Sequence, residues 1–381
     1  MQAENVKEKN KEIFLLFCVL AIGLVLRLNN LSGRSLWTDE FFTLFQSSGH
    51  GVDIENFLDS LSHKQTPELL KAEDLKRFLQ NDPAKSIKDV SKGLLYTDTH
   101  PPLYFWIMYV WMKVFGDNAS AIRFFSVLMG LAAIFLAYRV GTYLFNTKVA
   151  FFCALFMSIS TFAVRYSQEA RSYALIMVLG LLSCLSILRF EKYNKNSDIF
   201  CFAIFNALGI YTHYFYSFLV IAQFVYFIIV SQKDREKNEK FYLAFLGSLL
   251  LLSGWVIPVI LKGYNFRKVE WIFGYPGLIN KIGYLCVGMM RFILMFDKPT
   301  ILEYLFLSVG SFCFIYMVFR GLKEGIPKYP SSFLFALIMF LTPLLGIFFL
   351  DIVQHGALLK QERFWMFSFL GFLFFAGYSL N

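Results

Sequence analysis

Long apolar runs separated by short polar segments dominate this chain of 381 residues. A run of about 18 or more apolar residues can cross the ~30 Å hydrocarbon core of a bilayer as a helix. An α-helix satisfies all the backbone groups of such a segment internally. The pattern therefore predicts an all-α polytopic membrane protein with about ten spans. The expected spans lie near residues 13–29, 121–143, 149–165, 172–189, 199–212, 214–230, 241–261, 301–319, 332–350 and 364–380.

Two further apolar stretches, 102–115 and 282–296, are short for a crossing. Basic residues in short loops mark the cytoplasmic side of a membrane protein. If neither stretch crosses, every basic short loop falls on the side of the N-terminus, whereas a crossing at 102–115 would invert the pattern. We therefore expect both stretches to be membrane-embedded or interfacial helices on the outer face, with both termini inside. The basic loops hold Arg139 and Lys148, then Arg189, Lys192 and Lys195, then Lys233, Arg235, Lys237 and Lys240, then Arg320, Lys323 and Lys328.

This topology divides the chain into a cytoplasmic N-terminus, residues 1–12, and one transmembrane domain, residues 13–381. The domain has a long first outer loop at about 30–120, a second at about 165–172 and an outer segment at about 262–300.

The first outer loop contains helix signals of its own. Residues 66–68 (Thr-Pro-Glu) combine an N-cap, a first-turn proline and an acid matched to the helix dipole. Asp82 and Pro83 repeat that signal, and Gly93 is a plausible helix end. We therefore expect interfacial helices within this loop.

Composition and charge support the membrane class and exclude others. Hydrophobic residues make up 57% and charged residues 17% of the chain, whereas soluble domains average about 25% charged. The net charge of +9 does not indicate nucleic-acid binding, because the basic residues lie in short loops, where they set topology and meet anionic headgroups. There is no GxGxxG or P-loop motif, so we do not expect ATP or a nucleotide sugar to be used on the cytoplasmic side.

The acidic pair Asp39-Glu40 is the first candidate for chemistry, just beyond the first span. An acid near a membrane is costly unless it is solvated or paired. Partial desolvation and a like-charged neighbour both raise the pKa of a carboxylate, which suits a general base. The alternative is that the pair begins the next helix.

The segment from Thr99 to Tyr104 is the second candidate. Pro101 and Pro102 fix the entry of a short helix, which is an architectural role. His100 differs, because a neutral imidazole at the outer interface can donate to phosphate or bind a metal.

A polar turn at 165–173 is the third candidate and lies on the same predicted face as Asp39. Arg171 is suited to hold an anionic leaving group bidentately. Glu169 can pair with it, or bind a metal or the acceptor, and the alternative is a plain interfacial salt bridge.

Arg363 and His213 are weaker candidates at outer ends of predicted spans. A divalent metal is an open alternative, with Glu169 and His213 as its weak candidate ligands, and no other cofactor is indicated. In this topology all the histidines fall on the outer face: His50, His63, His100, His213 and His355.

Taken in order, five motifs resemble those of the GT-C glycosyltransferases. The resemblance is to the protein O-mannosyltransferase and aminoarabinose-transferase group, whose bacterial relatives form a glycosyltransferase family 39-like set. It is strong over about residues 20–190 and generic afterwards. The motifs are LWTDEFF (36–42), THPPLYFW (99–106), AIRFFS (121–126), YSQEARSYAL (166–175) and ERF (362–364).

The resemblance implies transfer of a sugar from a polyprenyl-phosphate carrier to an extracytoplasmic lipid, glycan or protein, with inversion. By this resemblance Asp39 matches the catalytic carboxylate, and His100 stands where the aminoarabinose transferase has a lysine near the donor phosphate. Glu169 and Arg171 match the second polar loop. Many relatives carry an Asp near the position of Tyr173 and continue beyond the last span, and this chain departs from both features.

An inverting displacement needs one base on the acceptor hydroxyl and cationic support for the departing phosphate. Asp39, with its neighbour Glu40, is the expected base. A retaining mechanism would use two close carboxylates on either side of one bond, which sequence neighbours cannot easily straddle. The residues expected to bind the donor phosphate or substrate are His100, Tyr104, Glu169, Arg171 and Arg363.

Two other functions compete with glycosyl transfer. A transporter or lipid flippase tends to show inverted repeats and polar midplane residues, but no repeat is visible and midplane candidates such as Asn206 and Gln223 are sparse. An inactive scaffold would not need Asp39, His100 and Arg171. The Lys-, Asn- and Phe-rich composition indicates an AT-rich bacterial genome. We therefore expect the bacterial cytoplasmic membrane, an undecaprenyl-type carrier and an active site on the extracytoplasmic face.

Overall fold

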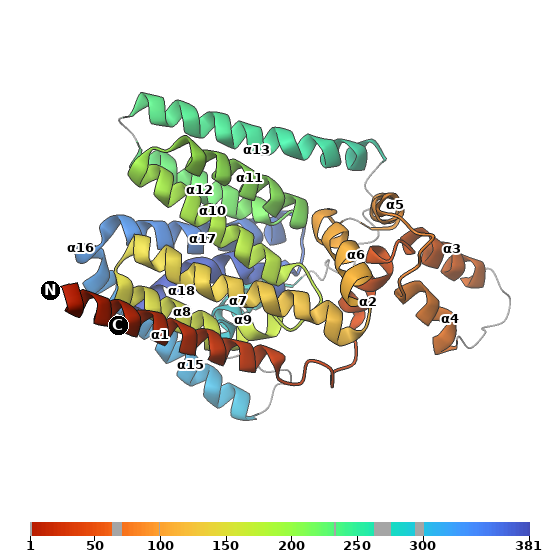
Figure 1. Ribbon diagram of the computed structural model, residues 1–381, viewed down its shortest axis with the longest axis horizontal. Helices are drawn as coiled ribbons and strands as arrows, with labels where there is room; N and C mark the ends of the chain where they lie inside the picture. Colours follow the sequence, from red (N-terminus) through yellow and green to blue (C-terminus); the bar gives the residue numbers. More distant parts are fainter. Residues whose placement is uncertain (1, 63–70, 99, 232–233, 263–275, 294–300) are drawn as a thin grey trace.

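The computed structural model describes residues 2–62, 71–98, 100–231, 234–262, 276–293 and 301–381, all helical or loop. Long helices lie side by side in a bundle, and short helices gather at one of its ends, opposite both termini (Figure 1). The helix start expected at 66–68, Thr99, His63 and residues 294–296 lie outside the described residues.

The bundle is built from long helices, and smaller elements connect them. The bundle helices are α1 (Gln2–Leu28), α7 (Ala119–Leu144), α8 (Thr147–Ile159), α10 (Tyr173–Tyr193), α11 (Asn196–Thr212), α12 (Tyr216–Val230), α13 (Arg235–Leu261), α15 (Ile301–Arg320), α17 (Pro330–Val353) and α18 (Met366–Ser379). The connecting elements are α9 (Thr161–Tyr166), α14 (Leu278–Arg291), η3 (Gly321–Gly325), α16 (Ile326–Lys328), η4 (Leu358–Lys360) and η5 (Glu362–Trp365).

We call the short helices between α1 and α7 the end lobe. They are α2 (Thr38–Ser47), α3 (Gly51–Ser62), α4 (Ala72–Lys76), η1 (Arg77–Leu79), α5 (Ile87–Thr97) and α6 (Leu103–Phe115). The chain is an integral membrane protein with several apolar spans. Among the described residues, α7, α10, α13 and α17 are long and apolar enough to cross a bilayer, and α6, α8 and α12 are shorter apolar helices.

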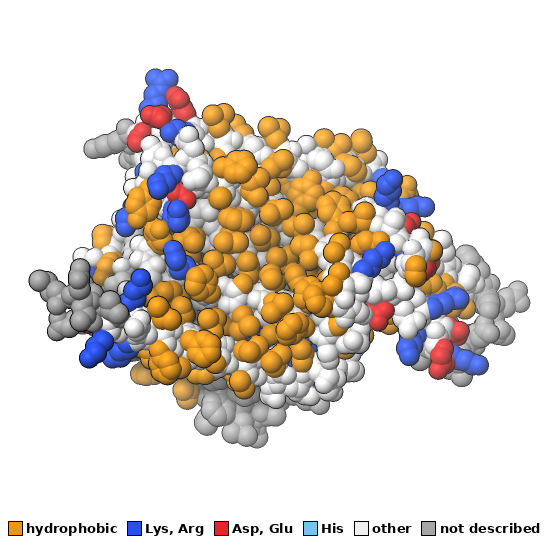
Figure 2. Space-filling model, in the orientation of Figure 1, with side chains coloured by type: hydrophobic (Ala, Val, Ile, Leu, Met, Phe, Trp, Pro, Cys, Tyr) orange, Lys and Arg blue, Asp and Glu red, His pale blue; other side chains and the backbone are white. Residues whose placement is uncertain are grey.

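Burial differs sharply among these helices. The apolar stretch of α10 is 83% buried and that of α13 only 11%, so α10 lies in the centre and α13 on the periphery. Figure 2 shows a broad apolar surface over the middle of the bundle, with charged side chains gathered at its ends. Such a surface is suited to lipid, because hydrocarbon rather than water must cover it.

Close helix approaches and internal hydrogen bonds hold the bundle together. A Cβ on Gly371 of α18 would lie 2.3 Å from the backbone nitrogen of Phe340 in α17, which is the approach that small residues permit. Three buried polar side chains bond one another: Ser183 lies 2.7 Å from Asn206, and the Asn206 amide donates to Gln223 at 3.1 Å. Asn206 and Gln223, the midplane candidates for a transport path, are thus satisfied by contacts between helices.

The span expected at 149–165 is interrupted and comprises two helices, α8 and α9. The chain breaks at Ser160, whose ψ is 122°, between α8 and α9. The Ser160 hydroxyl accepts from the Ala163 backbone N–H at 3.4 Å and donates to the Phe292 carbonyl at 2.8 Å. The Ser160 side chain therefore caps the start of α9 and also bonds to a backbone carbonyl far away in the sequence.

Two signals in the first outer loop were also misinterpreted. Asp82 forms a turn, accepting from the Ala84 N–H at 2.8 Å, and α5 begins later, after Ser86. Gly93 does not end a helix. It lies inside α5, where a Cβ would be 3.3 Å from the Gly51 Cα, so it permits a close approach to α3.

The two short apolar stretches are helices at Leu103–Phe115 and Leu278–Arg291. Figure 1 shows α6 at the end of the bundle, grouped with α2 and α5 rather than alongside the long helices. Its position relative to the membrane stays a prediction.

We predict that Gly371→Ala lowers the thermal unfolding temperature of the detergent-solubilised protein by several degrees, because overpacking costs about 1–3 kcal/mol. The control is Gly247→Ala in α13, where no atom lies within 4 Å of the added Cβ. That variant should match or slightly exceed the wild type, since Ala is the better helix former. Equal losses in both variants would contradict the close packing of α17 and α18.

Candidate active site

The acidic pair opens α2, where the positive end of the helix dipole favours carboxylates. Consecutive helical residues point about 100° apart, so Asp39 and Glu40 face different surroundings. Glu40 is 1% exposed, whereas the Asp39 side chain is 21% exposed. The two carboxylates therefore do different things.

Glu40 sits in a buried ion pair with Arg123 of α7. The Arg123 Nε lies 2.8 Å from Glu40 Oε1 and its Nη2 lies 2.6 Å from Oε2, a bidentate arrangement. The Ala170 backbone N–H also donates to Oε1 at 2.9 Å. The remaining Arg123 N–H groups donate to the carbonyls of Leu31, Arg34 and Ser35 at 2.8, 2.9 and 3.0 Å.

Asp39 faces Arg363 instead. The Arg363 Nη1 donates to Asp39 Oδ2 at 2.5 Å, and the Arg363 side chain is 15% exposed. The guanidinium also lies 6.0 Å from the centre of the Trp37 ring and 5.6 Å from that of Phe364, within the range of cation–π attraction. The short helix η5, which precedes the last long helix α18, thus brings its arginine to the acid that follows α1.

Arg171 bonds to the backbone of Asp39 rather than to its carboxylate. Its Nη1 donates to the Asp39 carbonyl at 3.3 Å and to the Thr43 hydroxyl at 3.2 Å. Arg171 is 5% exposed, and its Nε has no hydrogen-bond partner among the described residues. A buried cation with an unused N–H favours an anionic ligand.

His100 approaches Arg171 from the start of α6. Its Nε2 lies 3.2 Å from the Arg171 Nη2, and its Nδ1 lies 2.8 Å from Asp98 Oδ1. Arginine only donates, so Nε2 accepts, and Nδ1 carries the proton and donates to Asp98. In this arrangement His100 orients Arg171 and has no N–H left for phosphate.

His213 packs beside these cations in the turn between α11 and α12. Its Nδ1 accepts from the Phe215 backbone N–H at 3.1 Å, so its proton sits on Nε2. Burial lowers the pKa of His213 to about 3, with smaller effects from His100, Arg171 and Arg363. His213 is therefore a neutral donor at physiological pH.

Glu169 titrates in the physiological range. Burial raises the pKa of Glu169 to about 7, although Arg165, whose Nε lies 3.3 Å away, partly offsets it. Its Oε2 is buried without a hydrogen-bond partner among the described residues. Perturbed carboxylates of this kind concentrate at functional sites.

Tyr104, in the first turn of α6, is 1% exposed. Its hydroxyl has no hydrogen-bond partner among the described residues, and its ring packs against Phe105 and Phe125. Glu169 and His213, the weak metal candidates, do not join a larger ligand set: within the described ranges no group of three or more His, Cys, Asp or Glu is placed to hold a metal ion.

The polar turn is anchored on the end of α1. The Gln168 amide donates to the carbonyls of Leu26, Arg27 and Asn29 at 3.0, 3.2 and 3.0 Å. The fully buried Arg27 in turn donates to the Ser158 carbonyl near the end of α8 at 3.0 Å. The sequence did not single out Gln168, Arg27 or Asp98. Arg27 carries a signal that could have been used, because an arginine inside an apolar run is costly in a membrane unless it has a hydrogen-bonding partner.

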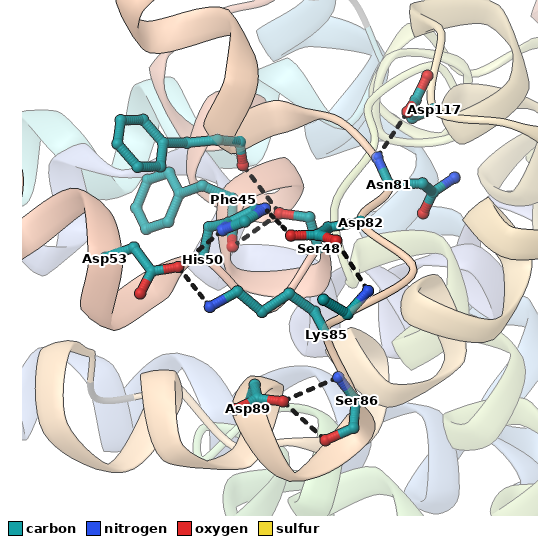
Figure 3. A network of polar contacts seen from close by, with 12 residues as sticks. Phe45, Ser48, His50, Asp53, Asn81, Asp82, Lys85, Ser86, Asp89 and Asp117 are labelled. Carbon is teal, nitrogen blue, oxygen red and sulfur yellow. Dashed lines mark hydrogen bonds and ion pairs between the residues drawn. The ribbon is translucent and has the colours of Figure 1, made fainter.

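A second polar network lies within the end lobe and includes His50, Asp53, Asp82 and Lys85 (Figure 3). Asp53 Oδ2 lies 2.8 Å from His50 Nδ1 and 2.5 Å from Lys85 Nζ, and Asp82 lies 3.8 Å from His50 Nε2. Burial opposes ionisation of Asp53, but the hydrogen bonds from Lys85 and His50 outweigh it and lower its pKa. These contacts tie α3 to the segment before α5 and hold the lobe in shape.

Two solved structures share this fold. One is ArnT from Cupriavidus metallidurans bound to undecaprenyl phosphate, with a TM-score of 0.57, 15% identity, and 96% of this chain and 59% of that chain covered. The other is the oligosaccharyltransferase AglB from Archaeoglobus fulgidus in complex with an inhibitory peptide and a dolichol-phosphate (TM-score 0.55, 12% identity, 97% and 50% covered). The chain therefore shares the fold of these two proteins.

The sequence comparisons are more specific. Residues 99–257 match the family described as dolichyl-phosphate-mannose-protein mannosyltransferase. The chain is 26% identical over 197 residues to "Putative mannosyltransferase YycA" of Bacillus subtilis, covering 48% of this chain and 28% of that protein. It is 24% identical over 289 residues to an uncharacterized protein of Aquifex aeolicus, covering 69% and 54%. The resemblance to this mannosyltransferase family, expected from the motifs, is confirmed, and the chain spans only part of the length of these relatives.

We predict that removing the charge of Glu40 destabilises the protein far more than removing the charge of Asp39. Glu40→Gln leaves Arg123 buried without its anion, which costs about 3–5 kcal/mol, and should sharply lower the unfolding temperature in detergent. Asp39→Asn is the matched control and should change stability by about 1 kcal/mol or less, since its pair is partly exposed. Equal stability of the two variants would contradict the structural role given to Glu40.

Proposed function

We propose that the chain transfers a sugar from a polyprenyl-phosphate carrier to the hydroxyl of an acceptor, with inversion at the anomeric carbon. The observation that carries this proposal is the placement of one accessible carboxylate, Asp39, against Arg363, with Arg171 bonded to the backbone carbonyl of the same residue. Such a cluster places a base, Asp39, next to two arginines that can bind an anion, at the start of α2. The resemblance to polyprenyl-phosphate-sugar-dependent transferases supports the same reaction class.

The reaction needs a base on the acceptor hydroxyl and a cationic site for the departing phosphate. Asp39 accepts the proton of the acceptor hydroxyl while the hydroxyl oxygen forms a bond to the anomeric carbon. The bond from that carbon to the carrier phosphate breaks, and the electron pair leaves with polyprenyl phosphate. Arg171 and Arg363 stabilise the charge on the departing phosphate, and His100, held by Asp98, keeps Arg171 oriented.

We further propose that the end lobe and the polar turn 165–172 face the extracytoplasmic side of a bacterial cytoplasmic membrane. One observation supports this assignment. The polar turn and α2 meet at the end of the bundle opposite the termini (Figure 1), and the termini are expected on the cytoplasmic side with the basic loops.

Transfer by the full chain in liposomes tests the proposal, with radiolabelled polyprenyl-phosphate mannose as the donor and cell-envelope extract as the source of acceptors. Asp39→Asn keeps the shape of the side chain and removes the base, so we expect at least a ~100-fold loss of rate. Glu169→Gln is the comparison variant and should retain most of the rate. Full activity of Asp39→Asn with loss in Glu169→Gln would transfer the base role to Glu169.

We also predict a pH effect on carrier affinity. Glu169, with a pKa of about 7, is neutral below that pH and anionic above it, and it lies close enough to Arg171 to interact electrostatically. Its negative charge opposes binding of a phosphate there. Wild type should therefore bind polyprenyl phosphate several-fold more tightly, relative to Glu169→Gln, at pH 6 than at pH 8. A pH-independent ratio between the two proteins, measured by titration of the carrier in detergent, would contradict this prediction.

A further inference from the structure

A groove lies on the end lobe between α5 and α6, on residues that take no part in the candidate active site. It has a volume of about 470 Å³, and its lining includes Lys88, Lys92, Leu95, Tyr96 and Trp106. An apolar trough of about 420 Å³ shares Trp106 and continues along α6 past Val110 and Val114. The two hollows form one track with a basic end and an apolar end.

The wall of this groove is rigid. The Trp106 Nε1 donates to the Ser91 hydroxyl at 2.9 Å, which ties α6 to α5. The Trp106 ring makes an edge contact with Trp255 of α13, with ring centres 6.2 Å apart. A buried cluster that includes Val90 and Phe105 lies behind it. The hollow is therefore preformed rather than opened by an occupant.

Positive charge gathers at one end of the groove. Lys88 and Lys92 are four residues apart on α5 and so share a face, and both are exposed. Lys262, just after α13, lies over the ring of Tyr96, and its pKa is lowered by partial desolvation and by the charge of Lys92. No acidic side chain lines either hollow within the described part of the chain. A ligand with an anionic end complements this arrangement.

The apolar end of the track is suited to lipid. Val110, Val114 and Phe115 are 54%, 68% and 55% exposed on the outer face of α6. Trp106 and Trp111 flank them, and tryptophan is enriched where a membrane meets water. A helix with such a face lies in the headgroup layer, with its apolar side against acyl chains.

Helix α6 separates this groove from the candidate active site. Phe105 is 2% exposed and makes an edge contact with His100, with ring centres 6.0 Å apart. Trp106, the next residue, points to the groove instead, because neighbours on a helix diverge by about 100°. An occupant of the groove therefore lies across α6 from Arg171 and is not the reacting phosphate.

We propose that the α5–α6 groove binds an anionic glycerophospholipid of the surrounding membrane. Lys88 and Lys92 hold the headgroup phosphate, and the upper part of one acyl chain lies against Trp106 and Val110. Bound lipid anchors the end lobe to the membrane surface beside the candidate active site.

Binding of brominated phosphatidylglycerol to the full chain in detergent tests the proposal, followed by quenching of tryptophan fluorescence. Lys88→Gln/Lys92→Gln should weaken binding about 30-fold, from two lysines at about 1 kcal/mol each. Lys71→Gln/Lys76→Gln removes the same charge from exposed positions of the lobe outside the groove and should change binding less than about twofold. Trp106→Phe should remove most of the quenching.

Competitors distinguish the sources of a phosphate group. Phosphatidylcholine and inorganic phosphate should displace the brominated lipid poorly. Displacement by polyprenyl phosphate at lower concentrations than by unlabelled phosphatidylglycerol would overturn the proposal and assign the groove to the carrier. Equal weakening in both lysine pairs would also overturn it, as non-specific attraction. Transfer activity is not a readout here, so the result stands apart from the proposed function.

Discussion

The buried ion pair between Glu40 and Arg123 is the contact on which the rest of the site depends. It joins the start of α2 to α7, and Glu40 also takes the Ala170 N–H of the polar turn. Its two charges are almost fully removed from water, at 1% and 3% side-chain exposure. Such a pair is stable only when its geometry is good and its remaining groups are bonded, and the hydrogen bonds that Arg123 donates to three backbone carbonyls meet that condition.

This pair explains why two adjacent acids differ in role. Because Glu40 is held inward, the helical geometry of α2 turns the Asp39 carboxylate toward Arg363, while Arg171 donates to the Asp39 backbone carbonyl. One acid fixes the position of α2, and the other stays accessible at 21% exposure. Fixed geometry matters for catalysis, since small misplacements of a reacting group are costly.

The two arginines around Asp39 are held by different contacts. Arg363 enters from η5 and pairs with Asp39 directly. Arg171 has no carboxylate in its hydrogen bonds and relies on Thr43, a carbonyl and His100. Burial keeps His213 neutral, so it adds a donor without adding charge. A phosphate that enters this site meets two guanidinium groups already in place.

Apolar run length predicted the helices well, because crossing a bilayer demands about 20 apolar residues. It failed at Ser160, because the break there uses the Phe292 carbonyl, which lies 132 residues away along the chain. The sequence motifs singled out residues from distant segments that the structure places together, among them Asp39, Arg171 and Arg363. They could not separate Asp39 from Glu40, because that difference comes from packing against Arg123, nor could they indicate that Asp98 fixes the tautomer of His100.

A structure of the protein with bound polyprenyl phosphate tests the central claim most directly. The account predicts phosphate oxygens within about 3 Å of the guanidinium nitrogens of Arg171 and Arg363, with the Asp39 carboxylate facing the open side of the phosphate and Glu40 still paired with Arg123. A phosphate bound away from both arginines, or a Glu40 carboxylate released from Arg123 to face the ligand, would contradict it.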